Sequence, residues 1–125
     1  MNAFLPSVLV VEDEPIILLC TADDLRDEGF TVYEARNADA ALVALEEHKD
    51  IGVMFTDVDM PGSMNGLTMS FVVRQHHPDM KILITSGMQK LPEYMMPAGG
   101  TFLPKPYLAS TVKRAITSPK GGVAL

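Results

Sequence analysis

The chain has 125 residues, one cysteine and a formal net charge of −6, and 47% of its residues are hydrophobic. This length suits one domain with its own core, so we predict a single domain over residues 1–125 with a core at about 7–117. The acidic balance argues against a nucleic-acid partner, and the lone Cys20 excludes an internal disulfide. No apolar stretch approaches the roughly 20 residues of a membrane span. We therefore expect a cytoplasmic protein without a membrane partner.

The first half of the chain alternates apolar runs with amphipathic helical patterns. A β-branched run at 7–11 predicts a buried strand. The helix predicted next, at 15–28, begins with a proline, which suits the first helical position, and Gly29 ends it. A second strand, at 31–35, precedes a helix that Asn37 caps.

The second half continues this alternation. We predict strands at 51–56, 81–85 and 101–103, and helices at 67–76 and 108–117. Between residues 88 and 100, Pro92 and Pro97 leave room only for a short or distorted helix. Residues 118–125 look like a flexible tail. Strands that alternate with helices predict an α/β fold: a doubly wound, five-stranded parallel sheet with helices on both faces.

Polar side chains follow the strands of this predicted sheet. In chain order they are Glu12 and Asp13, Asp57 and Asp59, Thr85 and Ser86, and Lys105. Because the carboxyl ends of parallel strands meet at one edge of a sheet, we expect these side chains to converge. Clustered carboxylates suit a hard cation such as Mg²⁺. A cation, a hydroxyl and an ammonium together neutralise phosphoryl oxygens, so the set points to phosphoryl chemistry.

Five motifs occur in order along the chain: Glu12-Asp13, Asp57, Met60-Pro61 with Gly66-Leu67, Ser86-Gly87, and Lys105-Pro106. Together they resemble the response-regulator receiver domain of two-component signalling, a flavodoxin-like (CheY-like) fold, over about residues 7–117. The resemblance implies the strand order 2-1-3-4-5. It also implies no enzymatic activity beyond self-catalysed phosphoryl transfer and autodephosphorylation.

The resemblance assigns roles to the acidic residues. It implies that Asp57 is the phosphoacceptor, phosphorylated by a histidine kinase or a histidine phosphotransfer protein. Asp13 and Asp57 would bind Mg²⁺ (or Mn²⁺) directly. Glu12 would act through a water molecule, and the backbone carbonyl of Asp59 would supply another oxygen.

The resemblance also implies a set of residues that respond to phosphorylation. Ser86 matches the hydroxyl that moves onto the phosphoryl group, Lys105 pairs with that group, and Phe102 matches the aromatic switch position. The adjacent Thr85 leaves the register open by one residue. We prefer Ser86 because the small Gly87 then occupies the neighbouring position that must admit the phosphodonor.

The main hypothesis is a phosphorylation-controlled module that binds a downstream protein and has no output domain of its own. It would be a stand-alone receiver or part of a larger regulator, and a monomer or a phosphorylation-dependent dimer. One alternative is a haloacid-dehalogenase-like phosphatase with Asp57 as nucleophile and Asp59 as general acid. That family's nucleophile follows its first strand, however, whereas Asp57 follows the third predicted strand. A second alternative is an interaction domain that does not depend on phosphorylation.

Overall fold

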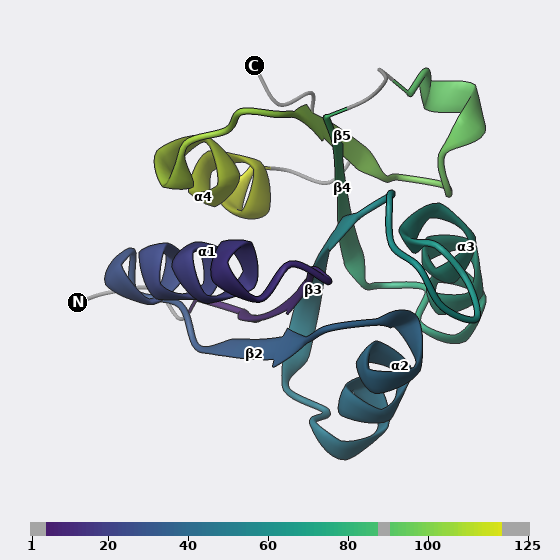
Figure 1. The fold of residues 1–125 in the computed structure, drawn as a ribbon, viewed down its shortest axis with the longest axis horizontal. Helices are drawn as coiled ribbons and strands as arrows, with labels where there is room; N and C mark the ends of the chain where they lie inside the picture. Colours follow the sequence, from purple (N-terminus) through teal and green to yellow (C-terminus); the bar gives the residue numbers. More distant parts are fainter. Residues whose placement is uncertain (1–4, 88–90, 119–125) are drawn as a thin grey trace.

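A sheet of five parallel strands, in the order β2-β1-β3-β4-β5, runs through the part of the chain that the computed structural model describes, residues 5–87 and 91–118 (Figure 1). The strands are β1 (Ser7–Val11), β2 (Val32–Ala35), β3 (Ile51–Asp57), β4 (Lys81–Ser86) and β5 (Thr101–Pro104). The helices are α1 (Pro15–Asp27), α2 (Ala38–Glu47), α3 (Gly66–His76) and α4 (Ala109–Thr117). The predicted fold class and strand order are confirmed.

Helices cover both faces of the sheet (Figure 1). One hydrophobic cluster joins the sheet to α1 and α4, and a second joins it to α2 and α3. In β1, Val8 and Val10 belong to the first cluster, whereas Leu9 and Val11 belong to the second. Side chains alternate between the faces of a strand, so a strand covered on both faces must be apolar throughout. This explains the uninterrupted apolar run that predicted β1.

The predicted ends of the elements agree with the structure to within one residue. Asn37 caps α2 as expected, since its Oδ1 accepts a hydrogen bond of 2.8 Å from the Ala40 amide. Gly29, with a φ of 103°, follows α1 in a conformation that a side chain would disfavour. The strand predicted at 51–56 extends by one residue, so that Asp57 is the last residue of β3.

The segment expected to hold a short or distorted helix contains a single 3-10 turn, Glu93–Met95, in its described part. Residues 88–90 lie outside the described residues. Leu91 and Met96 are buried in the α2/α3 cluster, whereas Tyr94 is 86% exposed. The segment therefore packs through isolated apolar side chains rather than along a helical stripe.

The last helix begins one residue later than predicted. Leu108 is its N-cap and is 70% exposed, whereas Val112, Ala115 and Ile116 are buried. At its other end, the Lys81 ammonium donates to the Ile116 carbonyl at 2.8 Å, as suits a cation at a helix C-terminus. Most of the predicted tail, residues 119–125, lies outside the described residues. Of the helices that the structure describes, none is long and apolar enough to cross a membrane.

Candidate functional site

The polar residues predicted to converge do meet at the carboxyl edge of the sheet. β1 pairs with β3 so that Val11 lies beside Thr56, which places Glu12 next to Asp57 in the following row. One carboxylate oxygen from each of Glu12, Asp13 and Asp57 lies within 4.8 Å of the others. The order of the strands in the sheet, rather than proximity in the sequence, brings these acids together.

The acid cluster is costly to bury without a cation. Burial raises the pKa of Glu12 from 4.5 to about 7, and the charge of Asp57 adds to this effect. The Glu14 amide, which donates to Glu12 Oε2 at 3.1 Å, and the nearby Lys105 oppose it. Hard divalent cations prefer oxygen ligands, and a cation would also relieve the repulsion among these three carboxylates. The residues present therefore fit Mg²⁺.

Lys105, which follows β5, is the cation of this cluster within the described residues. Its Nζ donates to Asp57 Oδ2 at 2.9 Å and lies 3.8 Å from Glu12 Oε1. Burial lowers the pKa of Lys105, but the hydrogen bond and the charge of Asp57, together with Glu12, outweigh it and raise the pKa above its usual value. Lys105 therefore stays protonated and holds a positive charge against the acid pair.

We expect the free energy of unfolding of the metal-free protein to fall as the pH rises from about 4.5 to about 7. In this window folded Glu12, with its pKa of about 7, binds a proton that the unfolded chain has released. The stabilisation is complete below the window and is lost as the pH passes the folded pKa. Its size should be on the order of 3 kcal/mol. Urea unfolding in EDTA across this range measures it.

The Glu12→Gln variant is the control for this prediction. Glutamine keeps the shape of the side chain and cannot ionise, so the variant should lose most of the pH dependence. It should also be more stable than the wild type at about pH 8. A slope in Glu12→Gln equal to that of the wild type would contradict the assignment to Glu12.

The two candidate hydroxyls of β4 lie on opposite faces of the sheet. Ser86 Oγ donates to Asp59 Oδ2 at 3.0 Å. Thr85 pairs with Asp57 across β3 and β4, and it shares its face with Leu83, which packs under α1 and α4. The Asp59 amide also donates to Asp57 Oδ1 at 3.1 Å. The contact between the Asp59 side chain and Ser86 has no sequence signal, because only the loop conformation creates it.

Phe102 lies on β5, and its partner on β4 is Ile84. Ile84 precedes Ser86 by two residues on that strand. Phe102 is half-buried and packs against the α2/α3 cluster. This placement puts an aromatic side chain beside the strand that ends at the candidate hydroxyl. The structure therefore places Phe102 on the strand next to the one that carries Ser86.

Gly66, the first residue of α3, lies directly against the backbone at the end of β3. Its amide donates to the Val58 carbonyl at 3.0 Å. A Cβ at this position would lie 1.8 Å from the Asp57 carbonyl oxygen, which is far inside van der Waals contact. The glycine of the Gly66-Leu67 motif is therefore required because the helix starts against the last residue of β3.

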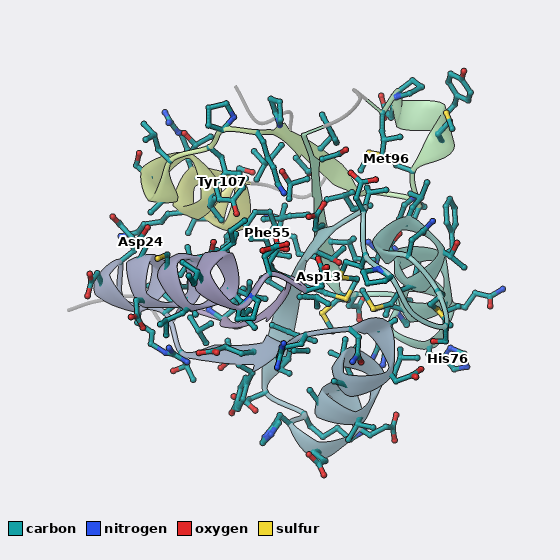
Figure 2. The ribbon with its side chains drawn as sticks, in the orientation of Figure 1. Asp13, Asp24, Phe55, His76, Met96 and Tyr107 are labelled. Carbon is teal, nitrogen blue, oxygen red and sulfur yellow. The ribbon has the colours of Figure 1, made fainter. Side chains whose placement is uncertain are left out.

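Sequence reasoning missed Tyr107, which follows the Lys105-Pro106 pair. Its ring packs edge-on against Phe55, with a centroid distance of 5.1 Å, under α1 and α4 (Figure 2). Its hydroxyl lies 3.2 Å from Thr21 Oγ1 on α1. The available signal was an aromatic residue directly after the lysine motif, but its partner is 86 residues away in the chain.

Comparison with known proteins agrees with this geometry. Residues 8–117 match the response regulator receiver domain. The sensor kinase CckA of Brucella abortus is 36% identical over an alignment of 118 residues that covers 88% of this chain and 12% of the kinase. The nitrogen assimilation regulatory protein NtrX of Azorhizobium caulinodans is 33% identical over 81 residues, 64% of this chain and 18% of that protein. The chain thus spans less than a fifth of the length of either relative.

Solved structures show the same similarity. The receiver domain of NtrX from Brucella abortus is 28% identical, with a TM-score of 0.76 over 90% of this chain and 100% of that one. A receiver domain protein from Clostridium thermocellum is 27% identical, with a TM-score of 0.79 over 90% and 91% of the two chains. Sequence, fold and the acid cluster agree: the chain belongs to the CheY-like response regulator receiver domains of two-component signalling systems.

Proposed function

We propose that Asp57 accepts a phosphoryl group from a histidine kinase or a histidine phosphotransfer protein. The observation that supports this most is the contact of 2.9 Å between Lys105 Nζ and Asp57 Oδ2, beside the carboxylates of Glu12 and Asp13. A nucleophilic carboxylate needs positive charge nearby when it approaches an anionic phosphoryl group. Lys105 supplies part of it. Mg²⁺ bound by Asp13 and Asp57, with Glu12 acting through water and the Asp59 carbonyl, would supply the rest.

In the proposed reaction an oxygen of the Asp57 carboxylate attacks the phosphorus atom, and the bond to the donor's imidazole nitrogen breaks. The product is an acyl phosphate on Asp57. Lys105 is already within hydrogen-bond distance of that carboxylate, so its ammonium follows the charge to the phosphoryl oxygens. The Asp59 amide, which donates to Asp57 Oδ1, holds the other carboxylate oxygen in place during the attack.

Phosphorylation then gives Ser86 a new hydrogen-bond acceptor. The phosphoryl group brings a charge of about −1.5 to −2 and strong acceptor oxygens. Ser86 would exchange Asp59 for the phosphoryl group, and Phe102 on the adjacent strand would move toward the vacated space. This is a shift between two arrangements rather than a continuous deformation. Thr85, which faces the interior on the other side of β4, is less well placed for this exchange.

Acetyl phosphate tests the proposal directly. With Mg²⁺ we expect intact mass spectrometry to show one added phosphoryl group, and EDTA should prevent the addition. Beryllofluoride with Mg²⁺ should shift the amide resonances around Ser86 and Phe102. A protein that binds Mg²⁺ but takes up no phosphoryl group would contradict the proposal.

We do not propose that the protein is an enzyme for small substrates. The competing hypothesis, a haloacid-dehalogenase-like phosphatase using Asp57 and Asp59, predicts repeated turnover of a phosphoester such as p-nitrophenyl phosphate. The receiver hypothesis predicts that each protein molecule carries at most one phosphoryl group and releases it slowly as inorganic phosphate. Product released in large excess over protein would favour the phosphatase.

The exposed face of α1 is the proposed docking surface for the phosphodonor. Ile16 and Leu19 lie one turn apart on this helix and are 76% and 54% exposed. The helix begins two residues after Asp13, so a partner seated here would reach the acid cluster. We place this encounter, and the protein, in the cytoplasm.

Replacing Ile16 with aspartate should slow phosphotransfer from the partner protein by at least about tenfold. The partner would bury the isoleucine side chain in the complex, and the substitution puts a charge in its place. Labelling by acetyl phosphate needs no docking and should be unaffected. Phosphotransfer profiling against the kinases and phosphotransfer proteins of the source organism, followed by initial rates, measures the effect.

Val43→Asp is the matched control. Val43 is 54% exposed on α2, which covers the opposite face of the sheet, and the substitution introduces the same charge. It should leave transfer from the partner unchanged. Equal slowing by both variants would mean that net charge rather than docking at α1 controls the rate.

The output surface is proposed at the turn Glu93–Met95 and its surroundings. Tyr94, Met95 and Phe71 are exposed by 86%, 43% and 45%. They would meet a downstream protein or a second phosphorylated copy once Phe102 has moved on β5. Sedimentation with and without beryllofluoride would distinguish a monomer from a phosphorylation-dependent dimer.

A further inference from the structure

A small cavity lies under the acid pair, on the face of the sheet that α1 and α4 cover. The volume within which the centre of a water molecule can lie is about 10 Å³. The polar side chains that line the cavity are Glu12, Asp57, Thr85, Thr21 and Tyr107. These polar side chains come from β3, β4, α1 and the segments after β1 and β5. Figure 2 shows Tyr107 reaching toward Phe55 in this layer.

Thr85 has an unusual position in this wall. The residue is 2% exposed, and within the described part of the chain its hydroxyl has no hydrogen-bond partner. Buried hydroxyl groups in proteins almost always have one. Because Thr85 pairs with Asp57 across adjacent strands, its side chain shares the face and the row of the acid pair.

The cavity has the size and the chemistry that an internal water molecule needs. A site for one water requires about the volume of one water-sized sphere and two to four polar partners. Ionised carboxylates only accept hydrogen bonds, whereas a hydroxyl both donates and accepts. A water here would donate to a carboxylate of the acid pair and accept from the Thr85 hydroxyl. The Tyr107–Thr21 hydroxyl pair, whose members lie 3.2 Å apart, offers a further partner.

We propose that this cavity binds one water molecule that joins Thr85 to the Glu12–Asp57 pair and to the Tyr107–Thr21 pair. The water holds the Glu12 and Asp57 carboxylates from the side of the cavity that they line. Thr85 and Tyr107 are then positioning residues for the acid pair. The link also connects the phosphoacceptor to α1 through side chains on the face opposite Ser86 and Phe102. Only this positioning role rests on the proposed function.

The Thr85→Val variant tests the water in the absence of metal and phosphodonor. Valine keeps the shape and removes the hydroxyl. If the water is bound, the variant loses a partner of that water, and its folding equilibrium constant should fall about fivefold. If the cavity is dry, removing an unpaired buried hydroxyl should leave stability equal or higher, and this result would overturn the proposal.

A crystal structure at high resolution gives the direct observation. One ordered water within hydrogen-bond distance of Thr85 Oγ1 and of a Glu12 or Asp57 oxygen is expected. A cavity without electron density in well-ordered crystals would overturn the proposal. A double-mutant cycle of Thr85→Val with Tyr107→Phe should be non-additive in stability, because both residues bind the same water. Additive effects would overturn the link to Tyr107.

Two measurements test the positioning role. One is the rate of labelling by acetyl phosphate at saturating Mg²⁺, and the other is the affinity for Mg²⁺. Thr85→Val should lower one or both by about tenfold, as supporting hydrogen bonds around metal ligands commonly do. Thr85→Ser retains the hydroxyl and should restore both. Equal loss in the valine and serine variants would reject the positioning role. Failure of the wild type to be labelled would reject the proposed function, while the unfolding and crystallographic results would still decide the water site.

Discussion

The Asp57→Asn variant should take up no phosphoryl group from acetyl phosphate or from a phosphodonor protein. The amide of asparagine keeps the size of the side chain but is not a nucleophile, so labelling should fall by at least about a thousandfold. The fold should persist, because Asp57 is replaced by an isosteric residue at the end of β3. Intact mass spectrometry and labelling with radioactive phosphate measure the loss.

Asp59→Asn is the matched control, since it removes the same charge two residues later, in the loop that follows β3. It leaves the Asp57 carboxylate and its contact with Lys105 in place, so labelling should continue, although its rate will respond to the lost charge on the acceptor of the Ser86 hydrogen bond. A labelled Asp57→Asn variant together with an unlabelled Asp59→Asn variant would move the acceptor to Asp59.

Replacing Gly66 with alanine should destabilise the protein by about 3 kcal/mol or more. In an ordinary helix this change stabilises, because alanine has the higher helix propensity. Here the new Cβ would lie 1.8 Å from the Asp57 carbonyl oxygen, a backbone atom that cannot move without displacing the end of β3 or the start of α3. Urea unfolding of both proteins gives the difference. Labelling of Asp57 should fall with it, because the shift displaces the acceptor.

Gly87→Ala is the comparison for this effect. Its Cβ would meet the nearest side-chain atom, Lys105 Cδ, at an ordinary 3.5 Å, and its φ is not positive. We expect unchanged stability, or a gain of about 0.5 kcal/mol from the stiffer unfolded chain. Equal stability of Gly66→Ala and Gly87→Ala would contradict the inference that α3 approaches Asp57 too closely to admit a side chain.

The elements of the fold could be predicted because their signals are local. The apolar run of β1, the proline at the start of α1 and the cap at Asn37 each depend on residues within a few positions. Element ends differ by one residue because strand pairing decides them; β3 includes Asp57 because that residue still pairs with Thr85. Leu108 was misplaced because an apolar residue at a helix start fits the stripe in sequence but lies outside the helix in space.

The acid cluster could also be predicted, since the order of strands and the rule for their carboxyl ends are enough to place Glu12, Asp13 and Asp57 together. The choice between Thr85 and Ser86 could not be made this way. Adjacent strand residues point to opposite faces, so a one-residue shift in register exchanges their surroundings. The structure gives Ser86 a contact with Asp59 and gives Thr85 the interior cavity.

The amino-acid sequence alone determined the α/β class, the acidic edge of the sheet and the resemblance to a receiver domain. The tertiary structure decided the contacts between distant residues: Gly66 against Asp57, Tyr107 against Thr21, and Asp59 with Ser86. The reason is physical. Apolar residues that repeat every 2 or 3.6 positions show which side of a strand or helix faces a core. The contacts between distant residues depend instead on strand register and on the path of loops, across separations of up to 86 residues.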